Sequence, residues 1–328
     1  MKTRSMKSLI GALVASVMLA LPGQAADYPE RTITLIVPFA PGGSSDIVGR
    51  LFAQKLEEKL DQRVVIENVG GAGGTIGAQR AATAPGDGYT LFVGSGSELF
   101  IYRHLNPAPS YDTYRDFAPV GMLGAGPMVL MARPDLEASS FAELAGLAPE
   151  GGDVSLSYGS AGIGTFMHIA GEAARVRAHL DMEHVPYRGA GPLMVDVVGS
   201  QVDLGVSSLA GAMPFIRDGQ GKALAVTSAE RSALIPDVPA LSEQTGLEGF
   251  DLELWIGLFA PSSTPLEVVS ELAEATNEIV SAPDFGAQLE KQGMVARPDL
   301  RGEVLGSFIK GEDEKYRTVV VEAGIKAE

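Results

Sequence analysis

Short apolar runs alternate with amphipathic patterns through the first third of the chain. Residues 32–37 form a continuous apolar run, which is typical of a strand buried in a parallel sheet. Between Ser44 and Leu60 apolar residues recur roughly every four positions, and this spacing predicts a helix with one buried face. Further elements predicted here are strands at 63–69 and 89–93 and a helix at 75–84. The order βαβαβ is the unit of a doubly wound parallel sheet.

A second α/β series occupies the middle of the chain, and the C-terminal part is mostly helical. The predicted strands are 154–157, 182–185, 203–206 and 224–227, and the predicted helices are 165–178, one from about Pro192, 266–281, 284–292 and 300–323. Extended segments at 128–133 and 252–259 bracket the middle series. If both are crossovers, two α/β lobes are joined by two hinge strands around a cleft. A linear chain of two domains fits the same periodicity.

The N-terminus has the three parts of a secretory signal peptide. A basic region around Lys2 and Lys7 precedes an apolar core at 9–21, and small residues follow it. Cleavage is expected after Ala25 or Ala26. A membrane anchor is the alternative, but a span needs about 20 apolar residues and this core is shorter. The chain contains no cysteine, so a lipid anchor on an N-terminal cysteine is excluded.

The charge of the chain limits its partners. The formal net charge is −16, and loss of the three basic residues of the signal peptide makes it about −19. Such an acidic protein repels nucleic acid and anionic lipid. It also repels an anionic ligand at long range, so a site for an anion must depend on local dipoles. The cleaved chain has no other stretch apolar enough to span a bilayer, and we expect an exported, soluble protein.

Three loops rich in Gly, Ser and Thr follow predicted strands. They are residues 39–46, 94–97 and 158–165. Ligands of open α/β sheets bind at the carboxyl ends of the strands, where a helix start offers unpaired N–H groups and a positive dipole end. Gly42 and Gly43 allow a ligand to approach the backbone, and Ser44 or Ser45 can donate a hydroxyl or cap the helix. Any one loop could be an ordinary turn. Together they predict a site in which backbone N–H groups and hydroxyls hold a carboxylate.

Signatures of cofactor sites are missing. The glycine-rich segment 70–77 fails as a dinucleotide fingerprint because Ile76 stands where the third glycine is needed. We interpret it as a structural turn, with a ligand-lining role as the alternative. No P-loop occurs. His168 and Glu172 are spaced to share one helix face, but such a pair is a weak metal site, and a structural role for His168 is preferred. No cofactor or metal is expected.

Enzyme signatures are missing as well. The chain has no Gly-x-Ser-x-Gly elbow, no His-Glu-x-x-His motif and no cysteine nucleophile. A secreted hydrolase or transferase stays open only if the fold brings a histidine nitrogen to the hydroxyl of Ser44, Ser95 or Ser160. Asp203, at the start of a predicted strand, could face an amine, a hydroxyl or a water in a site, or could be a turn residue.

Several ordered motifs resemble a known family. They are Tyr28-Pro29, residues 36–46, Glu67-Asn68, residues 85–91, residues 158–172, residues 185–189 and Gln201-Val202-Asp203. Each is weak alone, but they follow the order of one family over nearly the whole chain. The chain resembles the substrate-binding proteins of tripartite tricarboxylate transporters, also called Bug proteins.

The resemblance implies a fold like that of type II periplasmic binding proteins, a Venus flytrap without catalysis. With the signal peptide at 1–25 and the two extended segments as hinge strands, the expected lobes are 26–127 plus 256–328 and 128–255. The implied function is that of a periplasmic monomer that closes over a small organic carboxylate, such as a di- or tricarboxylate or an aromatic acid, and delivers it to a membrane permease. A sensor that docks on a receptor kinase uses the same fold and stays an alternative.

The resemblance also implies which residues bind the ligand, with one carboxylate held by the first-lobe loop partly through ordered waters. The residues carried over are Phe39, Gly42, Gly43, Ser44, Asp46, Ser95 and Ser97 in the first lobe, and Ser160, Gly162, Gly164, Thr165 and Asp203 in the second. Glu98 would repel a carboxylate if it faced the cleft, so we expect it to point out or to meet a cationic group. Arg188 either reaches the cleft or makes a structural salt bridge.

Overall fold

The computed structural model describes residues 28–106 and 110–325, so the predicted signal peptide lies outside it. The strands are β1 (Ile33–Val37), β2 (Val64–Asn68), β3 (Thr90–Ser95), β4 (Phe117–Ala132), β5 (Leu156–Ser160), β6 (Met182–Pro186), β7 (Leu204–Ser208), β8 (Lys222–Val226), β9 (Glu253–Pro261) and β10 (Val295–Ala296). They form one path in the order β2-β1-β3-β9-β4-β7-β5-β6, with β8 and β10 also paired to β4.

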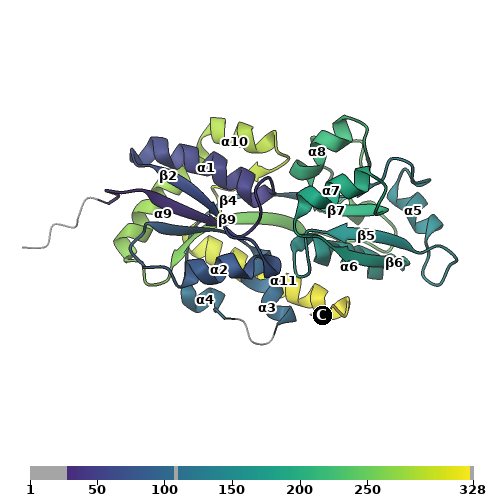
Figure 1. Ribbon diagram of the computed structural model, residues 1–328, viewed down its shortest axis with the longest axis horizontal. Coiled ribbons are helices and arrows are strands. Elements are labelled where there is room, and N and C mark those ends of the chain that lie inside the picture. The colour runs from purple at the N-terminus through teal and green to yellow at the C-terminus, as the bar shows by residue number, and fades with distance from the viewer. Residues whose placement is uncertain (1–27, 107–109, 326–328) are drawn as a thin grey trace, which may run out of the picture.

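The path consists of two parallel cores joined by antiparallel strands. On one side β1 lies parallel to β2 and β3, and on the other β5 lies parallel to β6 and β7. Between them β9 is antiparallel to β3 and β4. Figure 1 shows the result as two halves connected by β4 and β9. The predicted α/β Venus-flytrap fold is confirmed, whereas the lobe boundaries at 127/128 and 255/256 stay a prediction.

Strand β4 takes part in both halves. It is sixteen residues long. Phe117–Pro127 pairs with β9, and Met128–Ala132 pairs with β7. The sequence predicted only the last part of this strand, because prolines and glycines interrupt its apolar pattern. Irregularities in the β4–β9 register between Pro119 and Gly121, and again after Met122, accommodate these residues.

Helices cover both faces of the sheet. They are α1 (Ser44–Leu60), α2 (Thr75–Ala82), α3 (Tyr102–Leu105), α4 (Thr113–Asp116), α5 (Phe141–Leu147), α6 (Phe166–Arg177), α7 (Ala190–Val198), α8 (Leu209–Arg217), α9 (Leu266–Ser281), α10 (Pro283–Glu290) and α11 (Gly302–Glu322). In the first half α1 and α10 lie on one face and α2 and α11 on the other; in the second half α8 and α6 lie on opposite faces (Figure 1). No helix in 28–106 or 110–325 combines the length and apolarity needed to cross a bilayer.

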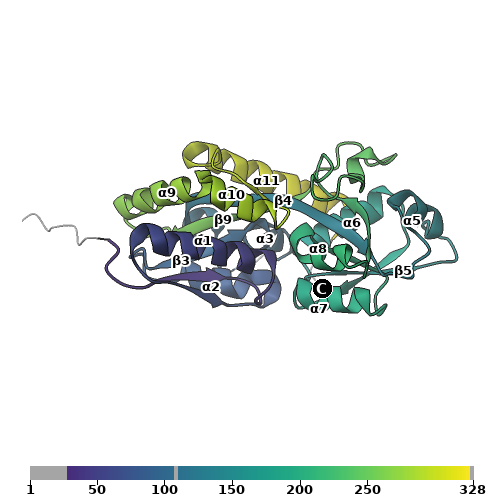
Figure 2. The same cartoon turned by 90° about the horizontal axis from the view of Figure 1, so that it is seen from above.

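The C-terminal helix α11 packs on the first half and also reaches the second. The ring of Tyr316 lies 4.9 Å from that of Phe166 at the start of α6. Farther along, Arg177 at the end of α6 forms an ion pair with Glu322. Figure 2 shows α11 running from the first half toward α6. Contacts at both ends of α6 therefore connect the halves in addition to the two shared strands.

Candidate functional site

Helix α1 begins with an open first turn. Its N-cap is Gly43, which has no side chain to cap the helix. The hydrogen bond from Ile47 N–H to Gly43 O is 2.9 Å long, and the N–H groups of residues 44–46 precede it. The positive end of the helix dipole lies at this point. Ser44 is buried, and its hydroxyl has no hydrogen-bond partner in the part of the chain that the structure describes. This geometry suits an anion.

The Asp46 carboxylate fixes the shape of the loop that precedes α1. It accepts hydrogen bonds from Gly42 N–H at 2.9 Å, from Arg50 Nε at 3.0 Å and from Asn68 Nδ2 at 2.9 Å. Burial acts to raise the pKa of Asp46, but the hydrogen bonds from Arg50, Gly42 and Asn68 lower it below its usual value. Asn68 also donates to Phe39 O at 3.0 Å. Asp46 is therefore an ionised support beneath the loop.

Glu98 lies beneath the turn that follows β3. It is fully buried. The Ser95 N–H and the Ser95 hydroxyl both hydrogen-bond to its carboxyl group. No cation pairs with it within residues 28–106 and 110–325. Burial raises the pKa of Glu98 to about 8, so its side chain is mostly uncharged at neutral pH. The expectation that Glu98 points out or meets a cationic group is wrong, because desolvation keeps a proton on it.

Two histidines hold the loop that follows β5. His168 Nδ1 accepts from Gly164 N–H at 3.2 Å, and the Ser160 hydroxyl lies 2.8 Å from His184 Nε2. The two imidazole rings stack with their centroids 4.1 Å apart. Burial lowers the pKa of each histidine to about 4. Both rings are therefore neutral at neutral pH and can accept hydrogen bonds from this loop.

A hydrolase would need a histidine nitrogen within hydrogen-bonding distance of a serine hydroxyl in these loops, and the Ser160–His184 contact has this geometry. Ser160 is fully buried, and it does not line the cavity described below. No described carboxylate hydrogen-bonds to the other His184 nitrogen. A nucleophile needs access to substrate and an oriented base. The pair has neither, and its role is to support the loop.

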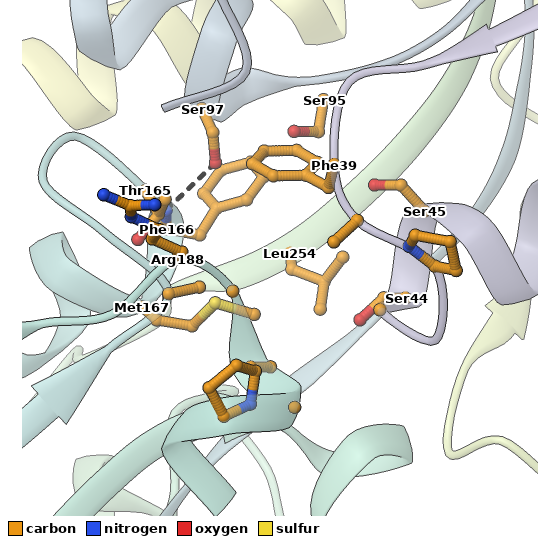
Figure 3. Close-up of a pocket in the computed structure, with 18 residues that line it drawn as sticks. Phe39, Ser44, Ser45, Ser95, Ser97, Thr165, Phe166, Met167, Arg188 and Leu254 are labelled. Carbon is orange, nitrogen blue, oxygen red and sulfur yellow. Dashed lines mark hydrogen bonds between the residues drawn. The ribbon is translucent and has the colours of Figure 1, made fainter. Parts of the chain in front are cut away.

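A hydrogen bond joins the two halves beside the loop of residues 160–165. The Thr165 hydroxyl caps α6 by accepting from His168 N–H and donates to Gly162 O at 2.7 Å. The next residue, Phe166, donates its backbone N–H to Ser97 Oγ at 3.0 Å. This bond is drawn as a dashed line in Figure 3. Ser97 follows β3 in the first half, whereas Phe166 begins α6 in the second.

A cavity of about 120 Å³ lies between the halves. A water molecule needs roughly 10–15 Å³ by the same measure, so a small organic molecule fits. Six of the residues predicted to bind ligand line it: Phe39, Gly43, Ser44, Ser95, Ser97 and Thr165. Figure 3 shows the side chains of Phe39, Ser44, Ser95, Ser97 and Thr165 around the space. The other six lie outside the lining: Gly42, Asp46, Ser160, Gly162, Gly164 and Asp203.

Asp203 has a different place in the structure. Its carboxylate accepts from Arg133 Nε at 2.9 Å and from the Ser157 N–H and hydroxyl at 2.8 Å each. Burial acts to raise the pKa of Asp203, but these hydrogen bonds lower it below its usual value. Asp203 thus joins the end of β4 to β5 and β7. The glycine-rich turn at 70–74 also lies outside the cavity lining; a Cβ at Gly74 would come within 3.0 Å of the Phe39 ring.

Several lining residues were not among those carried over as ligand-binding. Ala40, Pro41, Ser45 and Ala161 belong to the predicted loops, and Arg188 reaches the cavity as one alternative had it, whereas Phe166, Met167, residues 189–192 and Leu254 were not predicted. Arg188 is exposed and has no hydrogen bond or ion pair within the described ranges, so the alternative of a structural salt bridge is wrong. Residues 188–192 follow β6 and open α7, and the rule applied to the other strand ends would have found them. Leu254 belongs to β9, and nothing local marks it.

Comparison with known proteins identifies the family. A model described as the tripartite tricarboxylate transporter family receptor, TctC, matches residues 48–325. The chain belongs to the TctC family. Protein BugT of Bordetella pertussis is 34% identical over 325 residues, which cover 97% of each chain.

Solved structures of similar proteins agree with this assignment. The periplasmic binding protein BugD is 32% identical with a TM-score of 0.84, over 92% of this chain and 100% of BugD. R. palustris Rpa4515 with adipate is 29% identical with a TM-score of 0.85, over 92% and 99%. MatC from Rhodopseudomonas palustris with bound malate is 34% identical with a TM-score of 0.82, over 89% and 100%.

TctC proteins are substrate-binding receptors of the periplasmic binding type and not enzymes. Membership in this family agrees with the buried position of Ser160 and excludes a catalytic role for the Ser160–His184 pair. The loops after β1, β3, β5 and β6 line the cavity between the halves, and two of the related structures contain adipate and malate.

Proposed function

We propose that this TctC receptor is exported to the periplasm, closes its two halves over a small organic carboxylate and delivers it to a membrane permease of the tripartite tricarboxylate transporter type. The proposal includes cleavage near Ala25 or Ala26, action as a monomer, and lobes of 26–127 plus 256–328 and of 128–255. The change of partner along β4 supports the first lobe boundary, since Pro127 pairs with β9 and Met128 pairs with β7.

The start of α1 carries the proposal. The N–H groups of Ser44 and Ser45 and the unpartnered Ser44 hydroxyl lie at a cavity lined from both halves. A carboxylate there would accept these hydrogen bonds and would lie at the positive end of the helix dipole. Glu98 does not oppose it, because that side chain is mostly neutral at neutral pH. Adipate and malate in two related structures support the same ligand chemistry.

The position of the cavity supports closure. A ligand that contacts residues of both halves stabilises the arrangement in which the halves meet. The Ser97–Phe166 hydrogen bond is one contact that forms only when they meet. The sole tryptophan, Trp255, is buried in β9 with its ring 6.0 Å from that of Phe166. Its fluorescence therefore reports on the junction.

Thermal unfolding with a panel of organic acids tests the proposal. We expect at least one carboxylate to raise the Tm in a concentration-dependent way and to change Trp255 fluorescence, because a ligand that binds only the folded state stabilises it by RT ln(1 + [L]/Kd). Sugars and amines of similar size serve as controls. If no acid shifts the Tm at millimolar concentration while a control compound does, the carboxylate assignment is wrong.

A further inference from the structure

The cavity has one charged side chain, and that charge is positive. Among the described residues that line the space, Arg188 alone is ionisable. This contrasts with a chain whose formal net charge is −16. No carboxylate of the described chain pairs with the guanidinium. In Figure 3 it lies across the cavity from Ser44 in that view.

A second helix start accompanies Arg188. Helix α7 begins at Ala190, and its N-cap Gly189 makes no side-chain cap hydrogen bond. No atom lies within 4 Å of the place where a Cβ would stand on Gly189 or Gly191. The backbone here is therefore open to a ligand. A guanidinium next to an uncapped helix start is a strong combination for a carboxylate, since charge-assisted hydrogen bonds and the dipole act together.

The rest of the cavity has a largely apolar wall, and the side chains of Ser45, Ser95, Ser97 and Thr165 line the cavity as well. Phe39, Phe166, Met167 and Leu254 line it. Figure 3 draws Leu254 between Ser44 and the group of Met167 and Arg188. An apolar wall favours a ligand segment without polar groups, because a hydroxyl that lost its water there without a partner would carry a desolvation cost.

From these three observations, and resting on the proposed function, we propose that the ligand is a dicarboxylate with an apolar spacer. One carboxylate binds at the start of α1 with the Ser44 hydroxyl. The spacer, a methylene chain or an aromatic ring, lies on Leu254 and Met167. The second carboxylate binds Arg188 at the start of α7, so that the ligand bridges the halves. Arg188 then makes the site prefer ligands with two carboxylates over ligands with one.

A matched pair of probes tests this inference. Adipate and hexanoate have the same carbon chain and differ in the second carboxylate. Calorimetric titration of the full mature chain is expected to show adipate binding at least about tenfold more tightly than hexanoate. The variant Arg188→Gln should remove most of this advantage and leave hexanoate affinity within about threefold of wild type. The control Arg217→Gln makes the same charge change at an exposed position on α8 outside the cavity lining.

The outcomes separate the two proposals. If hexanoate binds as tightly as adipate, or if Arg188→Gln weakens both acids equally, the second carboxylate site is wrong and carboxylate binding stands. If both acids bind and Arg217→Gln changes adipate affinity as much as Arg188→Gln does, the effect is one of net charge and Arg188 is not the determinant. If neither acid binds and no other carboxylate does, the proposed function itself fails. Arg188→Lys, which keeps the charge and loses the planar fork, should give an intermediate adipate affinity.

Discussion

Ser97 Oγ accepts a hydrogen bond from the backbone N–H of Phe166 at 3.0 Å, across the junction of the two halves. Both residues also line the cavity, so the contact that joins the halves is part of the cavity wall. When the halves separate, water can replace Ser97 as the acceptor for this N–H. The bond therefore favours the closed arrangement and is coupled to ligand binding.

Removing the hydroxyl should weaken ligand binding more than folding. In Ser97→Ala the Phe166 N–H is left buried without an acceptor in the closed form, at a cost of about 1–2 kcal/mol. We expect affinity to fall about 5- to 30-fold, measured by Trp255 fluorescence titration, with the Tm of the ligand-free protein nearly unchanged. Ser139→Ala, at an exposed serine, is the control. Equal affinity in Ser97→Ala and wild type would show that the bond has no part in closure.

Gly43→Val should block the start of α1. A Cβ at Gly43 would meet only Ala40 O, at 3.8 Å, and its φ of −81° suits any residue. Folding should therefore persist, with a Tm within a few degrees of wild type. The added methyl groups project into the cavity beside Ser44, and we expect carboxylate affinity to fall by about tenfold or more. Gly146→Val, at an exposed glycine of α5, should bind normally. Wild-type affinity in Gly43→Val would remove the proposed site from this loop.

Glu98 should make the protein less stable as pH rises. Its folded pKa of about 8 lies above the usual 4.5, so the native state binds more protons than the unfolded state between these values. The free energy of unfolding should fall as pH rises from 4.5 through 8, by an amount on the order of 5 kcal/mol when ionisation is complete. Glu98→Gln should lack this decline in urea unfolding at pH 5, 7 and 9, whereas the exposed Glu303→Gln should retain it.

The stacked histidines His168 and His184 should make the protein less stable as pH falls. Their folded pKa values of about 4 lie below the usual 6.5, so the unfolded state binds more protons between these values. Stability should be complete above pH 6.5 and should fall as pH decreases through 4, by roughly 3 kcal/mol for each histidine. His184→Gln should show a shallower decline in this range than wild type. The exposed His179→Asn should decline like wild type; equal slopes in all three proteins would contradict this account.

The fold was predictable where apolar patterns are regular. Helix α1 begins at Ser44 and α9 covers Leu266–Ser281, as the spacing of apolar residues predicted. The short helices α5 and α8 were missed because seven or nine residues contain few turns, and Pro214 interrupts α8. Most of β4 was missed because its glycines and prolines serve contacts distant in sequence: a Cβ at Gly126 would lie 2.7 Å from Gly293 O.

The site was predictable where strand ends carry small polar residues. This rule found Ser44, Ser95, Ser97 and Thr165, all of which line the cavity. It included Ser160, Gly162 and Gly164, which lie behind the lining, because a loop motif does not show which way each residue faces. The charge state of Glu98 depends on its burial, which no local pattern reports.

The place of β9 in the sheet has a consequence for how the chain assembles. This strand lies between β3 and β4, and its residues 253–261 come after both in the chain. A chain that emerges from a ribosome or a translocon N-terminus first can pair β4 with β7 and β8, and β5 with β6 and β7, while the gap beside β3 stays open. Domains tend to fold in order of synthesis. Here the first half, which contains β1 to β3, is the last to be completed. Until β9 has been synthesised, the edge of β3 is unpaired and needs protection from pairing with other strands.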